Sequence, residues 1–117
     1  MYTYLITLDR VIDGDTIDAI INLGFNVQVK KRIRFMGINT PESRTRDLEE
    51  KARGLAAKAR VQELLETCAC ITLKSHGVGK YGRCLGELYL ELDEEAVNLN
   101  QLLISEGHAV EYFGGKR

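Results

Sequence analysis

Apolar and polar side chains alternate along the first third of the chain, and a period of two is typical of half-buried β-strands. The alternating segments are residues 2–12, 16–22 and 25–36. The turn residues Asp13-Gly14-Asp15 and Gly24 separate them, so we expect three antiparallel strands in a meander. Lys30-Lys31 interrupts the third segment. We interpret this as a one-residue slip and expect a β-bulge there.

A helical pattern follows over residues 48–67, where Ala, Leu, Glu, Lys and Arg dominate. Apolar residues at helical spacing predict one buried stripe. Its expected members are Leu48, Ala52, Leu55, Ala59, Val61, Leu64 and Leu65. Gly54 interrupts this helix and has two interpretations: a close contact with the sheet, or a glycine that is merely tolerated.

The last third predicts two more strands, at residues 69–74 and 83–91, and a shorter helix at about 97–106 that begins with the acidic run 93–96. Gly107 then ends the helix. Three strands, a helix, two strands and a helix predict a mainly β, α+β fold: a five-stranded Greek-key barrel of the OB type. Residues 1–117 are expected to form one domain.

Composition narrows the classes of function. The net charge is −1 and the pI about 6.1, which argues against a protein that coats nucleic acid without regard to sequence. A nuclease needs only a local basic site and stays possible. No apolar run is long enough to span a membrane, and the N-terminus has no signal-peptide pattern. The chain as written is therefore expected in the cytoplasm, or outside the cell if a leader was trimmed.

The cysteines and histidines do not indicate a disulfide framework or a metal site. Cys68, Cys70 and Cys84 are an odd number, so we expect reduced, buried thiols rather than a disulfide framework. A zinc site would need four ligands, and His76 or His108 could complete one only by a long-range coincidence that we do not expect.

Three short segments carry candidate chemistry. Residues 34–42 contain a cation, an amide, a hydroxyl and a carboxylate around the single proline of the chain, either as a plain turn or as a site on a rigid corner. Asp13-Gly14-Asp15 is either a hairpin turn or a source of oxygen ligands for a hard cation. Residues 77–82 match GxGxxG, but they lie between two strands and cannot be a dinucleotide fingerprint.

Together these segments resemble the staphylococcal nuclease (thermonuclease) family. The resemblance runs from Asp9 to about Tyr112 through V-x-D-G-D-T, R-x-x-G-I-x-T-P-E and K-Y-G-R. It implies an OB-fold barrel and calcium-dependent hydrolysis of phosphodiester bonds in DNA and RNA, with little sequence specificity. The family's C-terminal helix is absent from this chain, which we expect to remove packing but no site residue. We expect a monomer.

The resemblance also implies residue roles. Asp15 and the Thr40 carbonyl would bind Ca²⁺, and Glu42 would orient and deprotonate the attacking water. Arg34 and Arg83 would grip the scissile phosphate. The residues that would cover the nucleotide are Lys80, Tyr81 and Tyr112.

One position departs from the family. Asn39 stands where a second aspartate ligand is usual, and an amide oxygen keeps the reach but removes a charge, so weaker calcium binding is expected. The alternative function is a non-catalytic OB-fold module that binds nucleic acid or protein through a weakened site.

Overall fold

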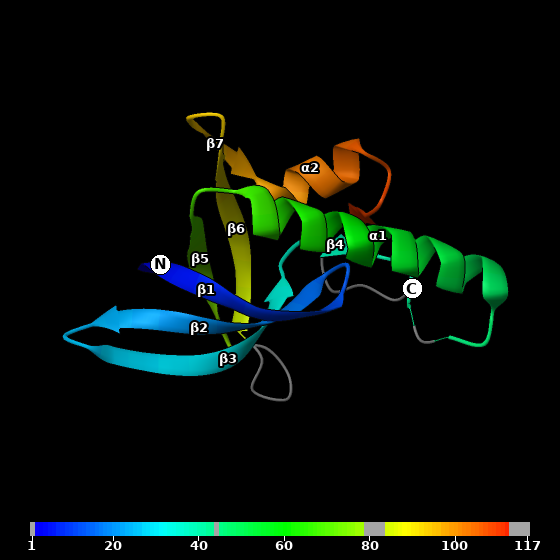
Figure 1. Ribbon diagram of the computed structural model, residues 1–117. Helices are drawn as coiled ribbons and strands as arrows, with labels where there is room; N and C mark the ends of the chain where they lie inside the picture. The colour runs from blue at the N-terminus through cyan, green and yellow to red at the C-terminus, as the bar shows by residue number, and fades with distance from the viewer. Residues whose placement is uncertain (1, 44, 79–83, 113–117) are drawn as a thin grey trace.

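A computed structural model of the chain describes residues 2–43, 45–78 and 84–112 (Figure 1). In chain order the elements are β1 (Tyr2–Asp13), β2 (Thr16–Gly24), β3 (Val27–Phe35), β4 (Ile38–Asn39), α1 (Leu48–Thr67), β5 (Ile71–Val78), β6 (Cys84–Leu92), β7 (Glu95–Asn98), α2 (Leu99–Ser105) and β8 (Val110–Glu111).

Five strands form a closed barrel. The antiparallel neighbours run in the order β3-β2-β1-β5-β6, and a parallel pairing between β3 and β6 joins the two ends. This closing seam pairs Ile33 with Cys84, Arg34 with Leu85 and Phe35 with Gly86. β7 adds to the free edge of β6, and β4 pairs with β8 in a separate two-stranded sheet. The predicted five-stranded OB-type barrel with two helices is confirmed.

The barrel core is filled by one face of each strand. On β2 and β3 it takes odd-numbered residues, among them Ile17, Ile33 and Phe35, each at most 1% exposed. The predicted bulge at Lys30-Lys31 is wrong, because β2 and β3 pair without a register shift there. The apolar residues before and after the two lysines share the same parity, so there is no slip. Lys31 occupies an odd-numbered position of β3, but it is exposed and lies outside the core. The register shifts lie in β1 instead, between Leu8 and Arg10 and between Val11 and Asp13.

Helix α1 has the predicted bounds, and Asp47 caps it by accepting hydrogen bonds from two backbone amides of the first turn. The first half of the predicted stripe is wrong: Leu48 is 78% and Leu55 47% exposed. The face turned to the barrel comprises Gly54, Ala57, Val61, Leu64 and Leu65. Its N-terminal part is built from the smallest residues because the helix backbone there approaches two loops closely.

The acidic run after β6 does not begin a helix, which corrects the prediction. Asp93 and Glu94 adopt left-handed backbone conformations (φ 49° and 67°), and the chain turns back as β7 to pair with β6. Helix α2 then starts at Leu99 with the Asn98 side chain accepting from the Gln101 amide at 3.1 Å. Gly107 follows the helix at φ 81°, as predicted for a C′ residue.

The three cysteines are free, as expected, but they are not all buried. Cys68 and Cys84 pack partly against the core, whereas Cys70 is exposed and its thiol donates to the Glu91 carboxylate at 3.1 Å. That contact raises the pKa of the Cys70 thiol. Within the described ranges, no helix has the length and apolar character needed to cross a membrane.

Candidate functional site

The site begins at the β1–β2 turn, which α1 holds in place. A Cβ atom at Gly14 would lie 2.7 Å from the Ala57 Cβ and 3.1 Å from the Thr40 hydroxyl oxygen, so only glycine leaves room for both neighbours. Ile12, just before the turn, is the extra residue of a β-bulge in β1. Helix and turn together fix the backbone on which Asp15 sits.

Asp15 is buried and its carboxylate is fully engaged. Oδ1 accepts from the Thr16 hydroxyl at 3.0 Å, and Oδ2 accepts from the Thr40 backbone amide at 3.2 Å. Oδ2 also lies 3.2 Å from Nη1 of Arg34. The Asp15 carbonyl accepts from the Phe35 amide at 2.8 Å. These contacts link the β1–β2 turn to the end of β3 and to the corner after it.

Arg34 lies between two of the predicted ligand side chains. One guanidinium nitrogen, Nη1, pairs with Asp15 and donates to the Phe35 carbonyl at 3.2 Å, and Nη2 donates to the Asn39 amide oxygen at 3.4 Å. Only 17% of the Arg34 side chain is exposed. One cation therefore contacts the Asp15 carboxylate of the β1–β2 turn and the Asn39 amide oxygen of β4.

The corner that follows β4 is pressed between α1 and the first turn. A Cβ at Gly54 would lie 2.4 Å from the Glu42 carbonyl oxygen, so this glycine marks a close contact, although with the loop rather than with the sheet. Ser43 donates from both its amide and its hydroxyl to Asp13. The Thr40 hydroxyl is buried without a hydrogen-bond partner among the described residues. Glu42 itself is exposed beside these anchored neighbours.

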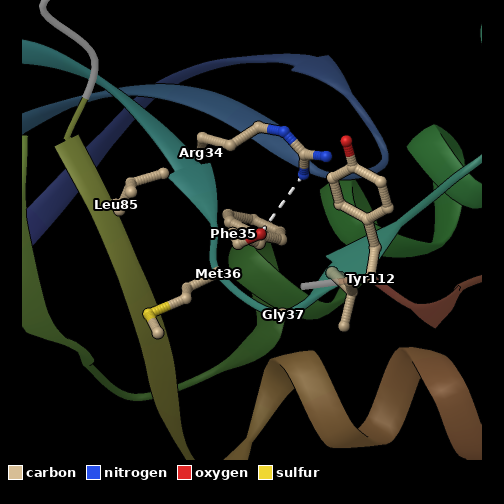
Figure 2. Close-up of a pocket in the computed structure, with 7 residues that line it drawn as sticks. Arg34, Phe35, Met36, Gly37, Leu85 and Tyr112 are labelled. Atoms are coloured by element: carbon tan, nitrogen blue, oxygen red, sulfur yellow. Dashed lines mark hydrogen bonds between the residues drawn. The ribbon is translucent and has the colours of Figure 1, made fainter. Parts of the chain in front are cut away.

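A pocket opens next to Arg34. Its volume is about 290 Å³, and it is mainly apolar. Arg34 and Tyr112 extend towards one another, and Met36 and Leu85 lie on other sides (Figure 2). The complete lining is Arg34, Phe35, Met36, Gly37, Ile38, Leu85 and Tyr112. This volume is at the lower end of the range for small-molecule pockets and matches a group the size of a nucleobase.

The structure thus brings together six of the nine predicted site residues. Asp15, Arg34, Asn39 and Thr40 are in direct contact as described, Glu42 is two residues beyond Thr40, and Tyr112 lines the pocket beside Arg34. The other three predicted residues are Lys80, Tyr81 and Arg83, and they lie outside the described residues.

Sequence reasoning missed Asn100, a buried residue of α2 that is hydrogen-bonded to the backbone beside the site. It is 2% exposed; its amide nitrogen donates to the Met36 carbonyl at 2.7 Å and its oxygen accepts from the Leu88 amide at 3.3 Å. An asparagine in an apolar run of α2 was the available signal, since buried amides are usually hydrogen-bonded. Met36 and Leu85 were also missed, because apolar pocket walls look like any core residue.

The donor chemistry suits a hard cation bound to oxygen. Asp15, Asn39 and the Thr40 backbone supply a carboxylate, an amide oxygen and a carbonyl, and the first two already share one cation, Arg34. No three His, Cys, Asp or Glu side chains of the described ranges gather into a metal-binding group. A divalent ion here would therefore depend on one carboxylate and on neutral oxygens.

The fold is a closed OB-type barrel with an acidic turn and a partly buried arginine that lines a pocket, and OB-type barrels are a class of fold that commonly binds oligonucleotides. The sequence profile described as "Staphylococcal nuclease homologue" matches residues 32–117. The chain belongs to the staphylococcal nuclease family.

Two curated relatives are similar over most of the chain. A micrococcal nuclease of Shigella flexneri is 31% identical over 108 residues, which cover 88% of this chain and 55% of the relative. The endonuclease YhcR of Bacillus subtilis (strain 168) is 33% identical over 113 residues, 91% of this chain and 9% of the relative. The chain thus spans about half the length of one relative and a small part of the other.

Proposed function

We propose that the chain is a calcium-dependent endonuclease that hydrolyses phosphodiester bonds of DNA or RNA with little sequence preference, acting as one domain. The observation that carries the proposal is the cluster of Asp15, Arg34 and Asn39 at the mouth of a pocket the size of a nucleobase. Its support beyond the geometry is family membership and two nuclease-named relatives.

In this proposal Arg34 binds the scissile phosphate. Its guanidinium can present two N–H donors to one phosphate, a geometry that matches the charge developing on the equatorial oxygens. Arg83 would add a second such fork. The base of the adjoining nucleotide enters the pocket between Met36, Leu85 and Tyr112, where aromatic and apolar walls read its face rather than its edges. Lys80 and Tyr81 would cover the nucleotide.

Glu42 orients the attacking water and takes its proton. The Glu42 side chain is exposed at the end of the corner. The close contact with Gly54 and the Ser43–Asp13 hydrogen bonds fix the backbone there, and this keeps Glu42 in place relative to Arg34. Asp15, Asn39 and the Thr40 carbonyl would hold Ca²⁺, which would supply charge stabilisation for the phosphate. To bind Ca²⁺, Asp15 and Asn39 must give up contacts with Arg34.

The test is cleavage of single-stranded DNA and of RNA by purified protein, with calcium and with EDTA. We expect fragments at millimolar calcium and none with EDTA, because a site with one carboxylate binds calcium weakly. Glu42→Gln should abolish cleavage, whereas Glu95→Gln, which removes the same charge on β7, should leave it unchanged. If the parent cuts neither substrate at any calcium level, the endonuclease proposal fails.

Asn39 offers a sharper test of the metal site. Asn39→Asp restores a second carboxylate and should tighten calcium binding by about tenfold or more, since calcium affinity follows the charge of the ligands. Isothermal titration with CaCl₂ measures this directly. An unchanged titration would show that residue 39 is not a ligand.

The same residue favours a second candidate, a non-catalytic module that binds nucleic acid. Asn39 accepts a hydrogen bond from Arg34, so the pair can persist without any metal. A gel that shows retarded plasmid or RNA but no fragments, with and without calcium, would support this alternative against the nuclease.

A further inference from the structure

A cluster of cations lies beside the candidate site, on strands β1 and β3 and on helix α1. Arg10, Arg32 and Lys58 line a cavity of about 160 Å³ together with Val11 and Ile12. None of the three cations belongs to the set proposed above for catalysis. Since a water molecule occupies about 30 Å³ in the liquid, the cavity has room for a group of phosphate size.

Asp18 holds the two arginines in a fixed arrangement. Arg10 donates from Nε to Asp18 Oδ2 at 3.2 Å; Arg32 donates from Nε to Oδ1 at 2.9 Å and from Nη2 to Oδ2 at 3.3 Å. The carboxylate is only about 10% exposed, and its pKa is held below the usual value, chiefly by the Arg32 hydrogen bond. Asp18 is therefore ionised at neutral pH and orders both guanidinium groups.

The cluster keeps an excess of positive charge. Three cations line the cavity, and Arg10 and Arg32 share the one carboxylate of Asp18, so two positive charges are not compensated within the cluster. Both Nη groups of Arg10 and Nη1 of Arg32 have no partner in the described part of the chain. The side chains of Arg10 and Arg32 are 65% and 44% exposed, so these donors can reach an anion from solvent. The excess stands out in a chain whose net charge is −1.

Strand geometry aligns the cluster with the candidate site. Arg32 and Arg34 are two residues apart on β3 and lie on the same face of the strand, about 6.6–6.8 Å apart along it. Their partners on β2 follow the same order: Asp18 pairs with Arg32 and Thr16 with Arg34. A polynucleotide strand whose scissile phosphate lies at Arg34 can therefore place a neighbouring phosphate at the cluster.

We propose that Arg10, Arg32 and Lys58 form a second phosphate-binding site, which takes the backbone phosphate of a nucleotide next to the scissile one. This inference rests on the proposed function, because it assumes that Arg34 receives the scissile phosphate. Asp18 acts as a positioning residue that orients both arginines. The site recognises the sugar-phosphate backbone and adds affinity without sequence preference.

The test is binding of fluorescein-labelled oligothymidylates, followed by anisotropy in EDTA so that nothing is cut. One probe is a dinucleotide, and the other has about eight nucleotides, within the site size of one OB fold. Lys58→Gln and Arg10→Gln each leave Asp18 paired with Arg32. Lys31→Gln is the matched control, since Lys31 is exposed on the opposite face of β3.

We expect Lys58→Gln and Arg10→Gln to weaken binding of the longer probe several-fold. The slope of log K against log salt should become shallower by about 0.7 for each cation removed, as for one lost phosphate contact to a single strand. Binding of the dinucleotide should be unchanged in both variants. Lys31→Gln should match the parent with both probes.

Equal affinities and salt slopes for Lys58→Gln, Arg10→Gln and Lys31→Gln would overturn the proposal, and the cluster would then be an internal ion-pair network only. If such a protein still cuts DNA or RNA with calcium, the proposed function stands while the second phosphate site fails. A parent that shows the expected slopes but never cuts would keep the binding site and refute the nuclease. A parent that binds neither probe refutes the second phosphate site, whereas the nuclease is judged by the cleavage assay with calcium.

Discussion

Gly54→Ala tests the contact between α1 and the corner of the site, because two physical effects predict opposite signs. Alanine is a better helix former than glycine by about 1 kcal/mol, so intrinsic propensity alone predicts stabilisation. The new Cβ, however, would lie 2.4 Å from the Glu42 carbonyl oxygen and 2.7 Å from the Ser43 amide nitrogen. Backbone atoms cannot rotate away as the end of a side chain can.

The magnitude follows from these distances. Overpacking costs about 1–3 kcal/mol, and the upper value applies because Ser43 is also tied to Asp13 by two hydrogen bonds. Subtracting the gain in propensity leaves a net loss of about 2 kcal/mol. For a chain of this size that corresponds to a fall in Tm of roughly 8 °C.

Urea unfolding followed by circular dichroism measures the difference. Ala56→Gly on the exposed face of α1 is the control, and it should lose only the propensity of about 1 kcal/mol. If Gly54→Ala gains about 1 kcal/mol, as a mirror image of this control, then the helix does not press on the corner and the reasoning is refuted. The cleavage rate of Gly54→Ala should fall by more than the loss of folded protein explains, because the displaced backbone carries Glu42.

Other expectations concern single residues. Phe25 and Asn26 form the β2–β3 turn with φ values of 54° and 62°, and Phe25 is fully exposed, so Phe25→Asn should stabilise the chain by about 1 kcal/mol in urea. Asn100→Leu should cost about 3 kcal/mol or more in the same assay, because it leaves buried backbone groups unpaired. Arg60 lowers the pKa of Glu106 through paired hydrogen bonds. Their contribution of about 0.5–1 kcal/mol is complete above the ordinary glutamate pKa near 4.3, and it is lost as the pH falls from there through the lowered pKa of Glu106 in the folded chain.

Each of these has an outcome that contradicts it. An unchanged or lower stability of Phe25→Asn would mean that the turn is not strained. A neutral Asn100→Leu would mean that relaxation or water satisfies the exposed backbone groups. For the ion pair, unfolding of Arg60→Gln and the parent is compared from pH 7 to pH 3, and a difference that does not shrink with acid would show that the charge of Glu106 is not the cause.

Local signals in the sequence were sufficient for most elements. The range of α1 was predicted because propensity and composition agree over its whole length, and the first three strands because turns separate them clearly. The sequence-based predictions were wrong where contacts between distant segments determine the local structure. The acidic run before α2 favours a helix start by charge, but pairing with β6 makes Glu95–Asn98 a strand. The buried face of α1 was misassigned because Gly54 and Ala57 are buried for their small size, not for their hydrophobicity.

The candidate site shows the same division. The corner around Asn39 and Thr40 was predictable because its chemistry lies within nine residues, and its contact with Asp15 follows from the hairpin pairing of β2 and β3. Nothing local indicates that β3 also pairs in parallel with β6, which brings Leu85 to the pocket. Nor does any local signal place Lys58 of α1 beside Arg10 and Arg32, because that proximity depends on how the helix lies across the barrel.

The parallel seam between β3 and β6 has a consequence for folding. Among the described residues, three residue pairs close the barrel, and they join segments about fifty residues apart in the sequence, so forming the seam carries a large entropic cost of loop closure. The pocket has walls on both sides of this seam, with Arg34 on one side and Leu85 on the other. Any ligand of the pocket therefore binds only the closed barrel and stabilises it by RT ln(1 + [L]/Kd). Ligand binding in the pocket and closure of the barrel are therefore thermodynamically coupled.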